Sequence, residues 1–283
     1  RCFCRKTERK AHMKNKIVTV FGLGFIGLPL SLSFALRGCQ VTGVDVNEKL
    51  VNDLNQGITF HLEKKDGYTI QQILKEQIAH GRFKATMDAA SARASSSEII
   101  VAVGVPVING IPDLSYIKSA VKTISAHLRN GQLVIIRSTV TPGTTRHVLQ
   151  PILESTGLQA EKDFYLAYAP ERIAEGRAFE EFENMPTIIA GVGPKSRQRA
   201  KELLSIVTRA DLIEASSIEV AEISKVFENI SRDVDIAMVN EFSTITKALG
   251  IDIFEVIKLA NTHKRVNLLT PGPGVGGYCL PNA

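Results

Sequence analysis

The chain has 283 residues, of which 44% are hydrophobic and 22% are charged, proportions typical of a globular protein with a sizeable core. The formal net charge is +5, but most of the excess lies in residues 1–12, so the sequence predicts no basic surface and no nucleic-acid partner. Four Cys and no apolar run of about 18 residues or more predict a cytoplasmic protein with reduced thiols and no membrane association.

Residues 1–12 precede Met13, where the first patterned segment begins. We interpret them as a disordered tail or leader outside the fold. Cys2 and Cys4 are too close together for a usual zinc site, and neither a second Cys pair nor a His cluster completes one. The sequence therefore predicts no bound metal.

The first patterned segment is a βαβ unit. An apolar run at residues 17–21 is followed by Gly22-x-Gly24-x-x-Gly27, a helical stretch and a second strand that ends at Asp45. Glycines let a pyrophosphate approach the backbone at a helix N-terminus, and an acidic residue binds the ribose hydroxyls while repelling a 2′-phosphate. This pattern predicts NAD rather than NADP. The expected contacts in this unit are Gly22, Gly24, Phe25, Ile26, Gly27 and Asp45.

Strand and helix patterns alternate as far as Glu214. Further strands are expected at residues 41–44, 99–103, 133–136 and 164–168, with helices from residue 70 and over residues 113–128. This alternation predicts an α/β fold with a doubly wound parallel, Rossmann-like sheet over residues 13–214. The polar segment at residues 63–66 has no predicted structure.

Two predicted strands are followed by polar residues, at the edge where such sheets bind ligands. Ser138 and Thr139 follow one strand, and their hydroxyls suit either a bound water or substrate oxygen, or helix capping. Glu171, Arg172 and Glu175 follow another, and they suit either general-base chemistry or a solvated charge cluster.

From Ser216 the pattern becomes helical. A capping box at residues 216–219 and apolar residues at helical spacing predict one helix as far as Leu249, about 50 Å long. Its apolar residues occupy more than one side, which predicts a junction between domains or subunits. Lys225 and Asn229 lie on one stripe with Arg232, as either a solvated face or a pair that stabilises an oxyanion. A shorter helix is expected at residues 253–261.

The last stretch, residues 270–279, is rich in Gly and Pro and ends at Cys279. It predicts a loop that turns sharply and lets a bulky partner approach. The thiol is either incidental to a surface loop or a nucleophile.

Taken together, these motifs resemble the UDP-glucose/GDP-mannose dehydrogenase family from Lys16 to Pro281. The motifs that carry the resemblance are Gly22-x-Gly24-x-x-Gly27 with Asp45, Ser138-Thr139-Val140-x-Pro142-Gly143-Thr144, Pro170-Glu171-Arg172 with Glu175-Gly176, Ala221-Glu222-x-x-Lys225 with Asn229, Asn240-Glu241, and Gly274-x-Gly276-Gly277-x-Cys279.

The resemblance implies two successive hydride transfers to NAD, which take the C6 alcohol of a UDP-sugar to a carboxylate in polysaccharide biosynthesis. It implies that Cys279 is the nucleophile, that Lys225 and Asn229 stabilise charge on the C6 oxygen, and that Glu171 is the base, with Thr139 and Glu175 placing the water. Substrate contacts are implied for Arg172, Lys225, Asn229, Arg265 and Gly276, and cofactor contacts for Val105 and Thr139. It also implies a homodimer formed through the long helix at 217–249, within a helical domain at 215–283.

Within the family, residues 231–234, 260–267 and 271–277 are similar to the branch that acts on UDP-N-acetylmannosamine. The chain departs from the family at Glu63-Lys64, Val105-Pro106 and Ala283, and it lacks the family's third domain, so we expect a truncated form. Two alternatives stay open: a two-electron β-hydroxyacid dehydrogenase, which needs no Cys, and a non-catalytic remnant that binds NAD and dimerises.

Overall fold

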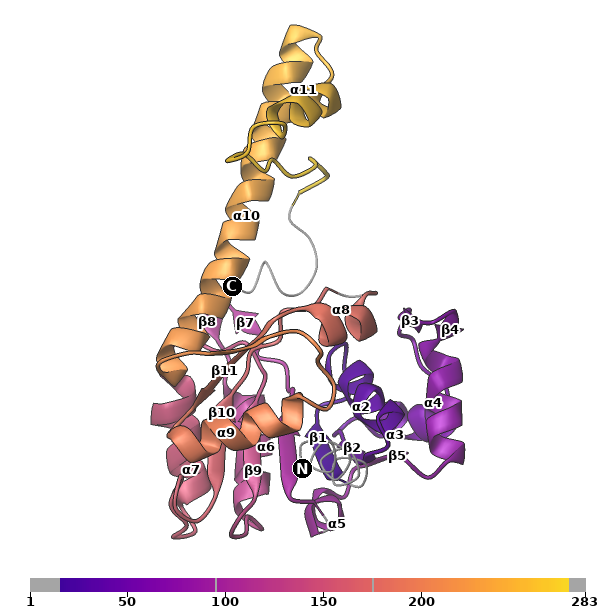
Figure 1. Ribbon diagram of the computed structural model, residues 1–283, viewed down its shortest axis with the longest axis vertical. Helices are drawn as coiled ribbons and strands as arrows, with labels where there is room; N and C mark the ends of the chain where they lie inside the picture. The colour runs from indigo at the N-terminus through magenta and orange to yellow at the C-terminus, as the bar shows by residue number, and fades with distance from the viewer. Residues whose placement is uncertain (1–15, 95, 175, 275–283) are drawn as a thin grey trace, which may run out of the picture. The chain divides into compact units, whose positions relative to one another are not determined.

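The computed structural model describes residues 16–94, 96–174 and 176–274 (Figure 1). The chain forms two compact units, the first ending at Glu222 and the second beginning at Ile223. The proposed boundary between residues 214 and 215 precedes this division, because Ile218 and Ala221 of the long helix pack into the core of the first unit. The tail proposed at residues 1–12 lies outside the described residues.

The first unit is built on an eight-stranded sheet with the order β12-β11-β10-β9-β6-β1-β2-β5. Its strands are β1 (Ile17–Phe21), β2 (Gln40–Val44), β5 (Phe83–Thr86), β6 (Glu98–Val101), β9 (Leu133–Ile136), β10 (Tyr165–Tyr168), β11 (Thr187–Gly191) and β12 (Leu212–Glu214). Two hairpins stand apart from it, β3 (Lys64–Lys65) with β4 (Tyr68–Thr69) and β7 (Val107–Ile108) with β8 (Ile111–Pro112). The first hairpin occupies the polar segment for which the sequence predicted no structure.

The α/β class with a Rossmann-like sheet is confirmed, but the sheet is mixed rather than wholly parallel. β11 runs antiparallel to β10, and β12 is parallel to β11. The connection from β10 to β11 contains α8 (Ala178–Asn184), which is about 10 Å long and so shorter than the crossover helices of parallel sheets. The chain therefore returns from the edge at which β10 ends, and β11 runs backward.

Helices cover both faces of the sheet (Figure 1). One core contains residues of α2 (Gly27–Leu36), α3 (Glu48–Asn55), α4 (Ile70–Ala79), α8 and α9 (Pro194–Leu204). The other contains residues of α5 (Ala89–Ala94), α6 (Ser115–Ser125), the π-helix η1 (Thr145–Leu149), α7 (Gln150–Glu154) and the first turn of α10. Successive side chains of β6 point to opposite faces of the sheet and so contribute to both cores. Ile100 packs into the first core, and Ile99 and Val101 pack into the second.

The second unit contains most of α10 (Ile218–Leu249) and α11 (Ile253–Ala260), close to the two predicted helices. The side chain of Ser217 accepts a hydrogen bond from Val220 N at 3.2 Å, so the helix is capped one residue later than the predicted Ser216. Among the described residues, no helix is long and apolar enough to cross a membrane.

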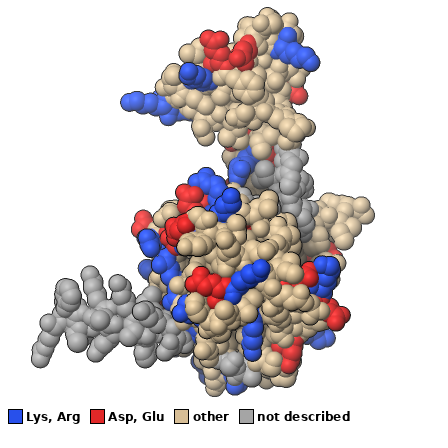
Figure 2. Space-filling model, turned by 90° about the vertical axis from the view of Figure 1, so that its right-hand side faces the viewer, with Lys and Arg blue, Asp and Glu red and all other residues tan. Residues whose placement is uncertain are grey.

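Figure 2 shows that Lys and Arg atoms are interspersed with Asp and Glu atoms over the visible face of the first unit. One ion-pair cluster within this unit joins three elements. Glu183 on α8 accepts hydrogen bonds from Arg37, at the end of α2, and from Lys65 on β3, each at 2.6 Å. Arg209 lies 3.9 Å from the same carboxylate. Burial acts to raise the pKa of Glu183, but these cations outweigh it and lower the pKa below its ordinary value of 4.5.

We expect Glu183→Gln to lose stability in a pH-dependent way. Because the folded-state pKa is lowered, the carboxylate stabilises the fold above its unfolded-state pKa, and this contribution disappears as the pH falls through the folded-state value. The difference in melting temperature between wild type and variant should therefore be largest near about pH 7 and should shrink progressively as the pH falls below about 4.

Glu180→Gln, at a mostly exposed position of the same helix, is the control and should change little at any pH. A wild-type-to-Glu183→Gln difference that does not change with pH would contradict the assignment.

Candidate active site

The glycine turn between β1 and α2 is shaped by close backbone contacts. Gly22 has a φ of +88°, and a Cβ there would lie 2.6 Å from the carbonyl oxygen of Ala102, beyond β6. A Cβ at Gly27 would lie 1.7 Å from the carbonyl oxygen of Gly22. At Gly24, by contrast, a Cβ would meet no described atom within 4 Å. The turn is therefore closed on its protein side and open at Gly24, as a phosphate cradle requires.

Asp45 holds this turn from the end of β2. Its Oδ2 accepts from Leu23 N at 2.8 Å, and its Oδ1 accepts from Asn47 N at 3.0 Å. At the start of α2, Ile26 occupies the N-cap position and provides no side-chain cap. The N-terminal N–H groups and the positive end of the helix dipole therefore suit a pyrophosphate. Phe25 is half exposed on the same turn.

The two other predicted cofactor contacts follow neighbouring strands. Val105 is half-buried in the segment after β6, and Thr139 is half-buried after β9. The Ser138 hydroxyl donates to Val103 O at 2.6 Å and so joins the two segments. The strand order reverses between β1 and β6, with β2 and β5 on one side and β9 and β10 on the other. The carboxyl ends of β1 and β6 therefore meet at the position where doubly wound sheets bind ligands.

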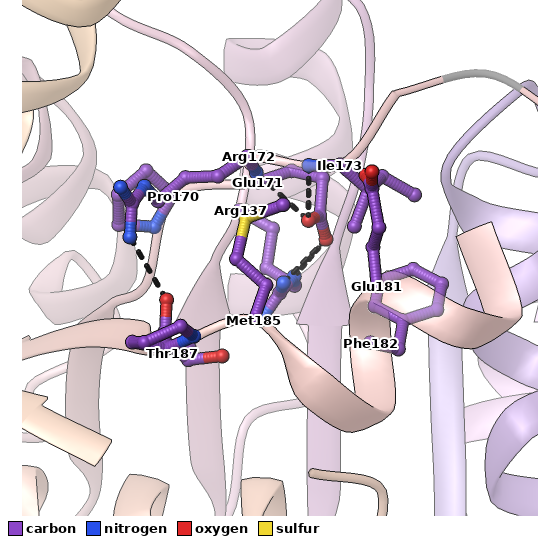
Figure 3. Close-up of a pocket in the computed structure, with 10 residues that line it drawn as sticks. Arg137, Pro170, Glu171, Arg172, Ile173, Glu181, Phe182, Met185 and Thr187 are labelled. Atoms are coloured by element: carbon purple, nitrogen blue, oxygen red, sulfur yellow. Dashed lines mark hydrogen bonds and ion pairs between the residues drawn. The ribbon is translucent and has the colours of Figure 1, made fainter. Parts of the chain in front are cut away.

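Glu171 follows β10 and forms a buried ion pair that sequence reasoning missed (Figure 3). Its Oε2 accepts hydrogen bonds from Nε of Arg137 at 3.1 Å and from the Nη2 group of the same residue. Its Oε1 accepts from Arg172 N at 2.8 Å and from Ile173 N at 3.1 Å. Both side chains are nearly inaccessible to solvent. Glu171 is thus a carboxylate held in one orientation by a guanidinium and two backbone N–H groups.

The same residues border a small cavity of about 10 Å³, which is room for about one water molecule. Arg172 lies at its rim and donates to Pro186 O at 2.9 Å (Figure 3). Glu181 of α8 accepts from Ala174 N at 2.6 Å and fixes the loop between β10 and α8. The backbone of residues 172–174 is therefore held by carboxylates on both sides.

Glu222 is a second buried carboxylate to which the sequence assigned no role. It is fully buried and accepts from Gly143 N at 2.6 Å and from Thr145 N at 2.9 Å, which caps η1. Burial raises the pKa of Glu222 above its ordinary value, although the two N–H groups act to lower it. Glu222 therefore joins the first turn of α10 to the loop that follows Thr139, within the first unit.

The second unit carries the other predicted polar pair. The Lys225 ammonium donates to Oδ1 of Asn229 at 2.9 Å, one turn along α10, and the residues are only 9% and 4% exposed. The alternative of a solvated polar face therefore does not hold for these two. Arg265 is exposed, and its backbone N–H donates to Nδ1 of His263 at 3.3 Å. Three predicted site residues, Glu175, Gly276 and Cys279, lie outside the described residues.

Comparison with protein families places these features in context. Residues 16–208 match the NAD binding domain of the UDP-glucose/GDP-mannose dehydrogenase family, and residues 219–283 match its central domain. The chain belongs to this family.

Individual relatives support the same family assignment. The chain is 39% identical over 264 residues to UDP-N-acetyl-D-mannosamine dehydrogenase from Pyrococcus horikoshii, covering 93% of the chain and 62% of that relative. It is 37% identical to UDP-N-acetyl-D-mannosamine dehydrogenase from Escherichia coli K12, with the same two shares. The chain thus spans less than two thirds of the length of these relatives.

Solved structures show the same likeness. The structure of UDP-D-ManNAc dehydrogenase from Pyrococcus horikoshii matches with a TM-score of 0.88, over 94% of this chain and 62% of that one. UDP-N-acetyl-mannosamine dehydrogenase from Staphylococcus aureus, 35% identical, matches with a TM-score of 0.82 over 94% and 63%. The first unit matches an NAD binding domain, and its glycine turn has the geometry that a dinucleotide requires. The cofactor of this unit is therefore NAD.

The glycine turn offers a matched pair of variants. We expect Gly24→Ala to keep the wild-type melting temperature and to weaken NAD binding by about tenfold or more, because the added methyl occupies the open side of the turn. We expect Gly27→Ala to lower the melting temperature, because its methyl collides with the backbone of Gly22.

Thermal unfolding and titration calorimetry with NAD measure both effects. Unchanged NAD affinity in Gly24→Ala would show that the cofactor does not approach this turn.

Proposed function

We propose that this chain carries the oxidising part of an NAD-dependent UDP-sugar 6-dehydrogenase, with UDP-N-acetylmannosamine as the favoured substrate. The observation that carries the proposal is the Lys225–Asn229 pair, a buried ammonium held by an amide oxygen on one rigid helix. An ammonium fixed in this way stabilises the negative charge that develops on the C6 oxygen as its hydroxyl proton passes to solvent, before C6 itself gives up a hydride to the cofactor. The mannosamine branch is supported by the names of the relatives above.

The oxidation requires a nucleophile once the C6 aldehyde has formed. Cys279 is the proposed one: its thiolate adds to the aldehyde carbon to give a thiohemiacetal, which loses a second hydride to leave a thioester. NAD is the hydride acceptor in both oxidations. Water then attacks the thioester carbonyl, and the C–S bond breaks to release the carboxylate and the thiol.

Hydrolysis of the thioester needs a base, for which we propose Glu171, with Thr139 and Glu175 placing the water. The cavity beside Glu171, large enough for about one water, supports this assignment. Arg137 is then a positioning residue, since its guanidinium orients Glu171. It must move away from Oε2 before that oxygen can accept a proton. Arg172, Arg265 and Gly276 are proposed substrate contacts, and Val105 a cofactor contact.

We also propose a homodimer formed through α10. Seven apolar side chains at least 36% exposed lie on one side of this helix within the second unit: Phe227, Ile230, Val234, Met238, Phe242, Ile245 and Leu249. Their spacing of three and four residues places them within about one third of the helix circumference. An exposed stripe of apolar side chains of this length suits a second copy of the same helix.

The dehydrogenase proposal is tested with a chimera that continues the chain after Ala283 with the remaining part of the Pyrococcus horikoshii relative. We expect two NADH per UDP-N-acetylmannosamine oxidised. Lys225→Met should lower kcat by about a hundredfold or more, because the oxyanion loses its charge partner, whereas the exposed Lys247→Met should not change it. Cys279→Ser should block the second oxidation.

One NADH per substrate together with full activity in Cys279→Ser would instead identify a two-electron β-hydroxyacid-type dehydrogenase. Normal NAD binding without turnover of any UDP-sugar would identify a non-catalytic protein.

The dimer is tested by sedimentation of the chain itself. Val234→Glu and Ile245→Glu place a charge in the stripe and should shift the protein to monomer, whereas Lys247→Glu, on the opposite side of α10, should not. A wild-type chain that sediments as a monomer at high concentration would refute the proposal.

A further inference from the structure

Residues 59–65, between α3 and α4, form an extended strap with an unusual burial pattern. His61 and Glu63 are buried, at 6% and 1% exposed, whereas Leu62 between them is 81% exposed. His61 and Glu63 are therefore turned toward the protein and Leu62 between them outward, whereas the aromatic ring of Phe60 packs against Phe25, with centroids 5.4 Å apart. Since apolar burial cannot explain this orientation, the contacts of the inward-facing side chains must.

His61 reaches the cofactor turn. Its Nε2 lies 3.1 Å from the carbonyl oxygen of Gly24, and because a carbonyl only accepts, Nε2 carries the proton and donates. The other ring nitrogen, Nδ1, lies 2.6 Å from the Thr59 hydroxyl, which can hydrogen-bond to it. Phe60 stacks on the imidazole, with ring centroids 4.3 Å apart. His61 therefore fixes the peptide of the one turn residue that is open for the cofactor to approach.

Glu63, two residues later, reaches the loop after β10. Its Oε1 accepts from Gly176 N at 3.2 Å, and among the described residues its Oε2 has no hydrogen-bond partner. A buried carboxylate with one neutral donor is a poor source of stability, because removing it from water costs more than one hydrogen bond returns. The buried position of Glu63 is explained better by its hydrogen bond to Gly176, which holds the backbone after β10.

Lys65 makes the third inward contact, to Glu183 of α8 at 2.6 Å. α8 follows the Glu171 loop directly, and β3 contacts it in the same unit (Figure 1). The strap therefore has one attachment on the cofactor turn and two on the segment that carries or follows Glu171, at alternate residues of one extended chain.

We propose that residues 59–65 are a positioning strap that links the NAD turn to the loop after β10, with His61 and Glu63 as its positioning residues. Binding of NAD at Gly24 steadies His61, and the stiff two-residue step to Glu63 carries that order to Gly176. The consequence for Glu171 rests on the function proposed above, whereas the link between the two backbone segments does not.

The test uses the intact chain and NAD alone, without a sugar. Titration calorimetry measures NAD affinity, and hydrogen exchange measures protection of residues 176–184 with and without NAD. In the wild type we expect NAD to raise protection there. His61→Phe should weaken NAD binding by about tenfold, and His61→Gln, which keeps a donor, should restore most of it. Leu62→Ala, on the outward side of the strap, is the matched control and should behave as wild type.

Glu63→Leu should bind NAD as wild type does but lose the NAD-induced protection of residues 176–184, and Glu63→Gln, which keeps an acceptor, should regain it. If Glu63→Leu does not fold, Lys65→Met takes its place with the same expectation. Wild-type NAD affinity in His61→Phe, or NAD-induced protection that survives in Glu63→Leu, would overturn the proposal. Failure of sugar oxidation would leave these readouts unchanged, so the two proposals fail separately.

Discussion

The carbonyl oxygen of Ala102 leaves no room for a side chain at Gly22, and the NAD site depends on that contact. β1 and β6 are neighbours where the strand order reverses, so the chain leaving β1 must turn beside the chain leaving β6. A Cβ at Gly22 would lie only 2.6 Å from the carbonyl oxygen of Ala102. A Cβ at Gly27 would in turn collide with the carbonyl oxygen of Gly22. Two unavoidable glycines thus fix the turn, and the open Gly24 is left facing outward.

The parts of the molecule that the sequence predicts are those governed by local rules. Alternating apolar strands and helices predict the α/β fold, and a Gly-x-Gly-x-x-Gly turn with Asp45 predicts the cofactor site, because each signal lies within one βαβ unit. The antiparallel direction of β11 is the point at which the sheet departs from the parallel arrangement that the sequence predicted. It depends on how far α8 carries the chain, which no periodicity records.

The contacts that sequence reasoning missed pair residues far apart in the chain. Arg137 follows a buried strand and finds Glu171 34 residues later, and Glu222 caps a helix 77 residues before it. A single charged residue next to an apolar run carries no information about its partner. The segment around Glu63 gave no hydrophobic pattern, because the buried residues there are the polar His61 and Glu63 and the residue between them, the apolar Leu62, is exposed.

These buried carboxylates share a physical logic, since a charge removed from water is tolerated only where donors surround it. Counting donors from the described residues, Glu171 has a guanidinium and two N–H groups, Glu222 has two N–H groups, and Glu63 has one. A carboxylate with more hydrogen-bond donors is held more firmly, and one with fewer donors moves more readily when a neighbouring residue moves. Of these three carboxylates, Glu63 has the fewest donors, so an additional hydrogen bond would stabilise it the most.

In α10 the spacing of residues separates two tasks on one helix. At 100° per residue, Lys225 and Asn229 lie opposite the apolar stripe that runs from Phe227 to Leu249. A second helix laid along that stripe would leave the Lys225–Asn229 side uncovered by it. The proposed dimer face and the proposed oxyanion-stabilising face can therefore share the helix, and pairing through one face would stiffen the backbone that holds the other.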